Sequence, residues 1–210
     1  PEELASFEGF MSNPELVQRW YSHRREIADE VDPNPAHHAL AQFEELYERF
    51  SVITQNVDSL HQRAGSQDVI ELHGNIGRNY CISCGHSATE EDLLQPDDEG
   101  LFRCPQCGGL IRPDVVWFGE MLPAAAVERA DHAARSADVF LSIGTSGVVY
   151  PAAAIPITAR LNGAYTAEVN VQRSAIASDL DEVVIGQAGV VLPKLLEAVR
   201  SARERKREAD

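Results

Sequence analysis

The chain has 210 residues, enough for one sizeable core or for a core plus a small module, and its 44% apolar and 24% charged residues are typical of a folded domain. No run of about 18 apolar residues and no secretory signal occurs, so we expect a cytoplasmic protein without a membrane partner. The formal net charge of −15 argues against a nucleic-acid partner and is compatible with basic protein tails. Its simplest interpretation is that it keeps the protein in solution.

Two Asn-Pro pairs mark helix starts in the first quarter of the chain. Asn13-Pro14 predicts a helix to about Arg25, and Asn34-Pro35 predicts a second helix with one apolar stripe. The stripe recurs at helical spacing in Leu40, Phe43, Leu46, Tyr47 and Phe50. Residues 51–55, 69–72 and 115–118 are predicted to be extended.

The second half alternates short apolar strands with helices. We expect helices over 123–136, 151–161 and 192–202, strands over 139–143, 167–170 and 183–185, and a frayed charged tail over 203–210. This alternation predicts an α/β fold with a Rossmann-like, mostly parallel sheet covered by helices on both faces.

Four cysteines interrupt this pattern within residues 78–112. The spacing Cys81-x-x-Cys84, then Cys104-x-x-Cys107, is typical of a zinc ribbon, and four protein ligands make a closed, structural site. Two disulfides or free thiols are the alternative, which the missing secretory signal disfavours. The ribbon by itself says nothing about the reaction.

Polar residues follow three of the predicted strands, where parallel sheets bind ligands. They are Gln55, Asn56 and Asp58, then Gly144, Thr145 and Ser146, then Asn170. His73 ends another predicted element and could act as a general base. A hydrogen-bonded core histidine is the alternative, and position alone favours it.

Together these residues resemble the sirtuin family. Residues 54–65, TQNVDSLHQRAG, are similar to the family signature, and ELHG at 71–74 is similar to the motif of its catalytic histidine. The four cysteines, PDVVWFGE at 113–120, GTS at 144–146 and Val169-Asn170 then follow in family order.

The resemblance implies NAD-dependent removal of acyl groups from protein lysines, giving nicotinamide and O-acyl-ADP-ribose, with one structural zinc ion. The acyl oxygen attacks the nicotinamide-bearing ribose carbon, and His73 accepts a proton from a ribose hydroxyl. By the same resemblance Gln55 contacts the ribose, and Asn56 and Asp58 line the nicotinamide pocket. Adenosine contacts are expected from Gly144, Thr145, Ser146, Asn170 and Ala188, and substrate contacts from Val116, Phe118 and Glu120.

Tyr21 and Arg24 lie three residues apart on the first long helix and resemble the Tyr-x-x-Arg signature of sirtuins that accept succinyl or malonyl lysine. Arg24 can pair with a carboxylate, Tyr21 can add a hydroxyl donor, and Ala5 stands where those members keep a small residue. A surface arginine beside a packed tyrosine is the alternative. Acetyl lysine is expected to remain a substrate.

The resemblance also divides the chain. It implies a helical cofactor-loop segment over 1–32, a Rossmann-like domain over 33–77 and 113–203, a zinc ribbon over 78–112 and the tail over 204–210. The family's first strand and glycine-rich phosphate turn do not occur in these 210 residues, so we expect weak NAD binding by this chain. We expect a monomer. The alternatives are a non-catalytic acyl-peptide-binding remnant and an ADP-ribosyltransferase.

Overall fold

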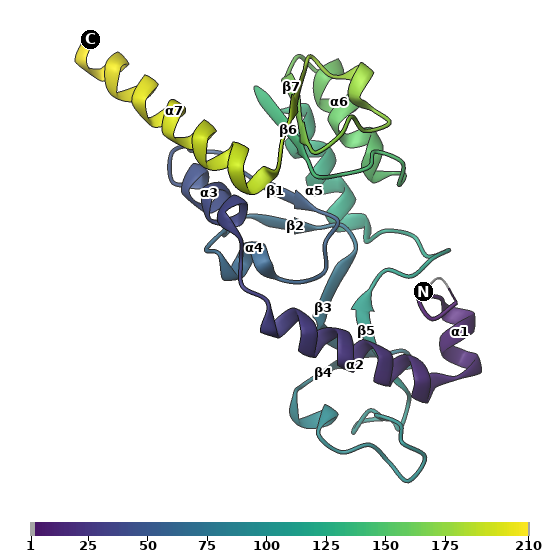
Figure 1. Ribbon diagram of the computed structural model, residues 1–210. Helices are drawn as coiled ribbons and strands as arrows, with labels where there is room; N and C mark the ends of the chain where they lie inside the picture. Colours follow the sequence, from purple (N-terminus) through teal and green to yellow (C-terminus); the bar gives the residue numbers. More distant parts are fainter. Residues whose placement is uncertain (1–2, 210) are drawn as a thin grey trace. The chain divides into compact units, whose positions relative to one another are not determined.

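A computed structural model describes residues 3–209, so the ends of the predicted segments 1–32 and 204–210 lie outside the described residues (Figure 1). The chain divides into two compact units. The first unit consists of Pro1–Asp32, Thr54–Ser59 and His73–Pro123, and the second of Pro33–Ile53, Leu60–Leu72 and Ala124–Asp210. The limits that the sequence predicts for four segments stay a prediction.

Two helices open the first unit, α1 (Phe7–Ser12) and α2 (Pro14–Glu30). Asn13 caps α2 as predicted, because its side-chain oxygen accepts a hydrogen bond from Leu16 N–H at 3.1 Å. The predicted end near Arg25 is wrong, since α2 continues to Glu30. Arg25 is not an exposed last turn: its guanidinium donates to the Ile76 carbonyl and to Asn79 Oδ1, both at 3.0 Å.

An antiparallel sheet in the order β4-β3-β5 forms the rest of this unit. Strand β3 (Gly74–Cys81) lies between β4 (Ser87–Ala88) and β5 (Ile111–Val115), and a short 3-10 helix, η1, spans Glu91–Leu93. The extended segment predicted over 115–118 leaves the strand after Val115. It is held instead by single backbone hydrogen bonds from Val116 N–H to His73 O and from Phe118 N–H to Ala5 O.

The second unit carries the predicted parallel sheet. Strands β6 (Val139–Ile143), β7 (Tyr165–Asn170) and β8 (Glu182–Ile185) pair in parallel in that order. Helix α5 (Ala124–Arg135) precedes β6, and η2 (Ala152–Ala154) with α6 (Ile155–Leu161) connects β6 to β7. A third 3-10 helix, η3 (Ala177–Asp179), precedes β8. The α/β class is therefore confirmed.

The other two predicted strands form a separate sheet among the described residues. Strand β1 (Val52–Thr54) pairs with β2 (Val69–Glu71), and the short helix α4 (Leu60–Arg63) lies between them in the chain. Thr54, the last residue of β1, belongs to the first unit. The sequence therefore predicted both strands correctly but not their separation from the parallel sheet.

Two helices pack together in the second unit, α3 (Pro35–Glu44) and α7 (Ala188–Ala209) (Figure 1). The stripe predicted to Phe50 is too long, because Leu46 N–H turns back onto Phe43 O and ends α3 at Glu44. The predicted frayed tail is also wrong. Helix α7 reaches Ala209, and Arg203 lies over the Tyr47 ring and donates to the Leu46 carbonyl.

Each unit has its own apolar core. The first is built on Phe10, Val17, Tyr21, Ile76 and Trp117. The second, between α3 and α7, is built on Ala36, Ala39, Leu40, Phe43, Val52, Val169, Leu192 and Leu196. No helix among residues 3–209 is long and apolar enough to cross a membrane.

Gln18 yields a stability prediction, because it is buried and ties α2 to the cysteine-bearing segment. Its side chain donates to the carbonyls of Phe102 and Ile111 and accepts from Phe102 N–H. Gln18→Leu leaves all three of these backbone groups without a hydrogen-bond partner and should lower the free energy of unfolding by about 2–4 kcal/mol. Urea unfolding measures the change.

The matched control is Gln42→Leu, since Gln42 makes one exposed hydrogen bond to its own helix, at His38 O. It should stay within about 0.5 kcal/mol of the parent. Equal effects of the two substitutions would contradict the role given to Gln18.

Candidate functional site

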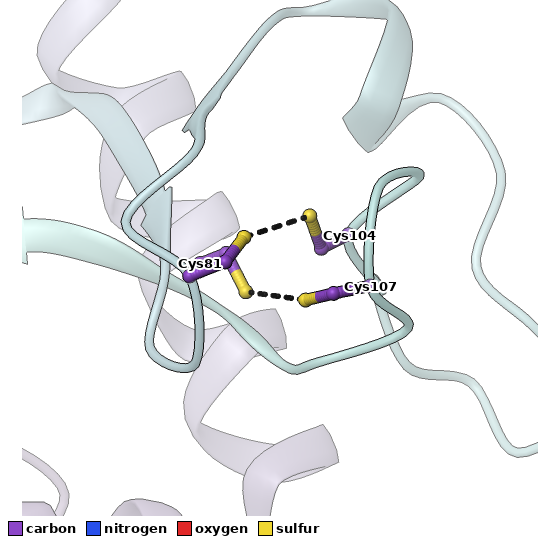
Figure 2. Close-up of side chains that lie close together, drawn as sticks. Cys81, Cys104 and Cys107 are labelled. Carbon is purple, nitrogen blue, oxygen red and sulfur yellow. Dashed lines mark hydrogen bonds between the residues drawn. The ribbon is translucent and has the colours of Figure 1, made fainter.

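The four cysteines meet between two turns of the first unit. Their Sγ atoms all lie within 4.8 Å of one another, with 3.5 Å from Cys81 to Cys107 and 3.7 Å from Cys84 to Cys104. Figure 2 shows the sulfur atoms pointing toward one another from the two sides. Tetrahedral zinc with Zn–S bonds of about 2.3 Å requires sulfurs about 3.8 Å apart. All four thiols are free, so the structure favours the zinc interpretation over disulfides.

The surroundings of the thiols also fit a dication. Burial raises the pKa of Cys81, but backbone N–H groups of Cys84 and Ser83 outweigh it and lower the pKa to about 6. At Cys107 the Gly109 N–H lowers the pKa, but the neighbouring thiols outweigh it and raise the pKa to about 12. A thiolate at one cysteine thus disfavours ionisation of the next, and a bound dication offsets this repulsion between negative charges. The residues present therefore fit a structural zinc ion.

His73 is held at both its ring and its backbone. Its Nδ1 lies 3.1 Å from the Gln55 carbonyl oxygen, and its own carbonyl accepts Val116 N–H at 3.0 Å. A carbonyl oxygen only accepts hydrogen bonds, so this contact assigns the proton to Nδ1 and leaves the lone pair on Nε2. The half-buried ring therefore carries a basic nitrogen of fixed direction.

The segment carrying Asn56 and Asp58 lies beside the chain that follows His73. The Thr54 hydroxyl accepts Asn56 N–H at 3.0 Å, which shapes the turn after β1. Val57 O accepts Ile76 N–H at 2.8 Å, and the Asn75 amide donates to the Ser59 hydroxyl at 2.7 Å. Asn56 is exposed and Asp58 is half-buried, so both are accessible to a ligand.

Tyr21 and Arg24 both contact the ring of Trp20 on α2. The Tyr21 ring packs edge-on against Trp20 at 4.6 Å between centroids, and the Arg24 guanidinium lies over the Trp20 ring at 4.9 Å. Tyr21 is buried whereas Arg24 is exposed. Burial raises the pKa of Tyr21 despite the cations of Arg24 and Arg112 and a hydrogen bond from Trp117, so the phenol stays neutral and can donate a proton.

Three other predicted substrate residues, Ala5, Val116 and Phe118, are connected through backbone hydrogen bonds. Phe118, which is 65% exposed, bonds through its N–H to Ala5 O, and Ala5 packs against the first core. Val116 is joined to His73 as described. The structure therefore links Ala5, Val116 and Phe118 to the segment that carries the histidine.

Glu120 has a partner that the sequence analysis missed. The buried guanidinium of Arg112 donates to both of its carboxylate oxygens, at 2.5 and 2.9 Å, and Trp117 N–H donates to Oε2 at 2.8 Å. Burial raises the pKa of Glu120, but these hydrogen bonds outweigh it and lower the pKa below its usual range. The signal in the sequence was an arginine next to Ile111 in a short segment that also carries Asp114.

In the second unit the predicted adenosine residues surround the ends of β6 and β7. Gly144 N–H donates to Val169 O at 3.0 Å, and the Asn170 amide donates to Thr145 O at 2.8 Å. Ser146 O accepts Ala175 N–H, while Ala188 begins α7 and packs on the second core. Gly144 has a φ of 63°, a conformation that favours glycine.

A buried carboxylate beneath these loops is the second residue that the sequence analysis missed. Glu168 is 0% exposed in β7, and its Oε1 accepts from the Asn170 amide at 3.1 Å and from Ser174 N–H at 2.9 Å. It therefore fixes the side chain of Asn170 and the loop after β7 together. A glutamate within the buried run of a parallel strand was the available signal.

Comparison with known proteins gives concordant matches. The sequence model described as "Sir2 family" matches residues 1–151. The chain is 50% identical over 209 residues to "NAD-dependent protein deacylase 2" of Pyrobaculum aerophilum, covering 100% of this chain and 82% of that protein.

Two solved structures agree with this. A crystal structure of a Sir2 homologue in complex with NAD has a TM-score of 0.89 and 42% identity, covering 96% of this chain and 78% of that chain. A Sir2 mutant with a p53 peptide and NAD has a TM-score of 0.86 and 34% identity, covering 93% and 83%.

The thiol cluster predicts one zinc ion per chain. Cys84→Ser should remove most of the bound metal and lower the melting temperature, because the ion contributes on the order of 10 kcal/mol to folding of a closed thiolate site. Elemental analysis and thermal unfolding with and without a chelator measure both effects. Ser87→Ala, an exposed change in β4, is the control, and a metal-free chain of unchanged stability would contradict the assignment.

Proposed function

The chain belongs to the Sir2 family, and from this premise we infer that it is an NAD-dependent protein deacylase that acts on acylated lysines. The observation that carries the chemistry is the contact between His73 Nδ1 and Gln55 O, at 3.1 Å. NAD supplies the ribose carbon that the acyl oxygen attacks as nicotinamide leaves. The chain's own part is to position that ribose and to move a proton.

We propose that His73 is the general base. With its proton on Nδ1, Nε2 can accept the proton of a ribose hydroxyl, and the imidazolium that forms is stabilised by the Gln55 carbonyl. The backbone bond from Val116 N–H holds the histidine in place during this transfer.

The remaining predicted contacts extend this proposal. Asn56 and Asp58 are accessible groups beside the same segment, and an amide dipole with a carboxylate stabilises positive charge that builds on a ribose. In the second unit, Gly144, Thr145, Ser146, Asn170 and Ala188 are proposed to bind adenosine. Their support is that Asn170 and Thr145 are joined directly and Glu168 fixes the Asn170 amide.

For the acyl group we propose an acidic chain such as succinyl or malonyl, with acetyl also accepted. The support is a neutral, buried Tyr21 hydroxyl and an exposed Arg24 cation on the same helix, sharing Trp20. A carboxylate can take a charge-assisted hydrogen bond from the guanidinium and a second one from the phenol. A cytoplasmic location and a monomeric state are part of the proposal.

His73→Ala tests the enzymatic role. It should lower nicotinamide release from NAD in the presence of a succinyl-lysyl peptide by about 10²–10⁴-fold, the usual contribution of a general base. Peptide binding should persist. His132→Ala on the exposed face of α5 is the control, and turnover that survives in His73→Ala would overturn the assignment.

Arg24→Met tests the acyl preference. The succinyl-to-acetyl ratio of kcat/KM should fall about tenfold or more, because the variant loses a charge-assisted hydrogen bond to the acyl carboxylate. Arg19→Met removes the same charge from an exposed arginine of the same helix and should leave the ratio unchanged. Equal losses for both peptides in Arg24→Met would refute the acidic-acyl proposal.

A further inference from the structure

Trp117 makes a buried side-chain hydrogen bond to one of the proposed acyl-binding residues. Its indole Nε1–H donates to Tyr21 Oη at 2.9 Å, and the two side chains are 2% and 4% exposed. The contact therefore raises the question of what it does to the Tyr21 hydroxyl.

Trp117 is held in place through both its ring and its backbone. The Arg112 guanidinium lies over the indole ring at 3.4 Å from its centroid, and the Phe10 ring packs against it with centroids 5.2 Å apart. Glu120 holds the main chain of the same residue, because its Oε2 accepts Trp117 N–H at 2.8 Å. Arg112 is itself buried and paired with Glu120. The indole N–H is thus a donor of fixed direction, and the cation over the ring increases its polarity.

A fixed donor decides where the Tyr21 proton points. A phenol has one O–H donor and accepts through its lone pairs, so when Oη accepts from Trp117 its own hydrogen must point elsewhere. Accepting that bond also makes the phenol a better donor, because hydrogen bonds in a chain polarise one another. Burial raises the pKa of Tyr21, so the hydroxyl keeps its hydrogen and can donate a hydrogen bond.

We propose that Trp117 is a specificity-determining residue, whose indole N–H orients the Tyr21 hydroxyl to donate to the carboxylate of an acidic acyl chain. This rests on the proposed acyl preference. Trp117 lies between Val116 and Phe118, so the same turn that faces the acyl-lysine also sets the Tyr21 proton. Arg24 supplies the charge, and the Trp117–Tyr21 pair supplies direction.

The experiment is Trp117→Phe, which keeps an aromatic ring and removes the N–H. We measure kcat/KM and equilibrium binding for matched succinyl-lysyl and acetyl-lysyl peptides. The succinyl-to-acetyl ratio should fall about three- to tenfold, the loss of one oriented hydrogen bond. In a Tyr21→Phe background the same change should shift the ratio no further, because the acceptor is already absent.

Val17→Ala is the control for packing. Val17 is 0% exposed in the same core and its side chain has no polar group. The substitution should therefore lower the free energy of unfolding and leave the succinyl-to-acetyl ratio unchanged. If Trp117→Phe fails to fold, Trp117→Leu also removes the N–H and leaves the Tyr21 hydroxyl in place, and an unchanged ratio in that variant overturns the role of Trp117.

The outcomes separate the two proposals. An unchanged ratio in Trp117→Phe, or an additive shift in the double variant, overturns the role of Trp117 while a selective loss in Arg24→Met upholds the acyl preference. An unselective Arg24→Met overturns the acyl preference and this inference with it. A fall in the succinyl-to-acetyl ratio in both Arg24→Met and Trp117→Phe, with no change in Val17→Ala, supports the acyl preference and the role of Trp117.

Discussion

The buried guanidinium of Arg112 organises the segment of the first unit that we propose to contact the acyl-lysine. A cation with 4% of its side chain exposed is costly to desolvate unless each donor finds a partner. Glu120 takes two of its N–H groups, the Val115 carbonyl takes another, and the Trp117 ring covers its face. Because these partners span only residues 115–120, satisfying the cation closes the chain into one tight turn.

That turn is tied to the histidine through the main chain. Val116 N–H bonds to His73 O through the backbone, and the His73 ring nitrogen Nδ1 contacts Gln55 O, so the histidine joins three separate stretches of sequence. The backbone bond fixes the main chain of His73, and the contact with Gln55 O then fixes the direction of its ring. The tautomer of His73 is thus a consequence of how the first unit folds.

The sequence predicted what depends on short spacing and missed what depends on long-range partners. Asn13 before Pro14 and the two Cys-x-x-Cys pairs carry local geometry in their spacing, and the structure confirms both. The end of α7 was misjudged because Arg203 is stabilised by Leu46 and Tyr47, about 157 positions away, which no local pattern reveals. Arg112 and Glu168 were overlooked for the same reason: a buried charge in a strand acquires meaning only from its partners.

Charge acts on two length scales in the proposed selection of substrate. A net charge of −15 repels an acidic acyl chain at long range and attracts basic peptide flanks. Yet exposed charges are screened beyond about 8 Å at physiological ionic strength, so over the last few ångströms the nearby Arg24 outweighs the distant carboxylates. An exposed guanidinium needs little desolvation, but it is also weakly oriented. The buried Tyr21 hydroxyl has the opposite properties, so under the proposed acyl preference a cation and a directed phenol should discriminate better than either group alone.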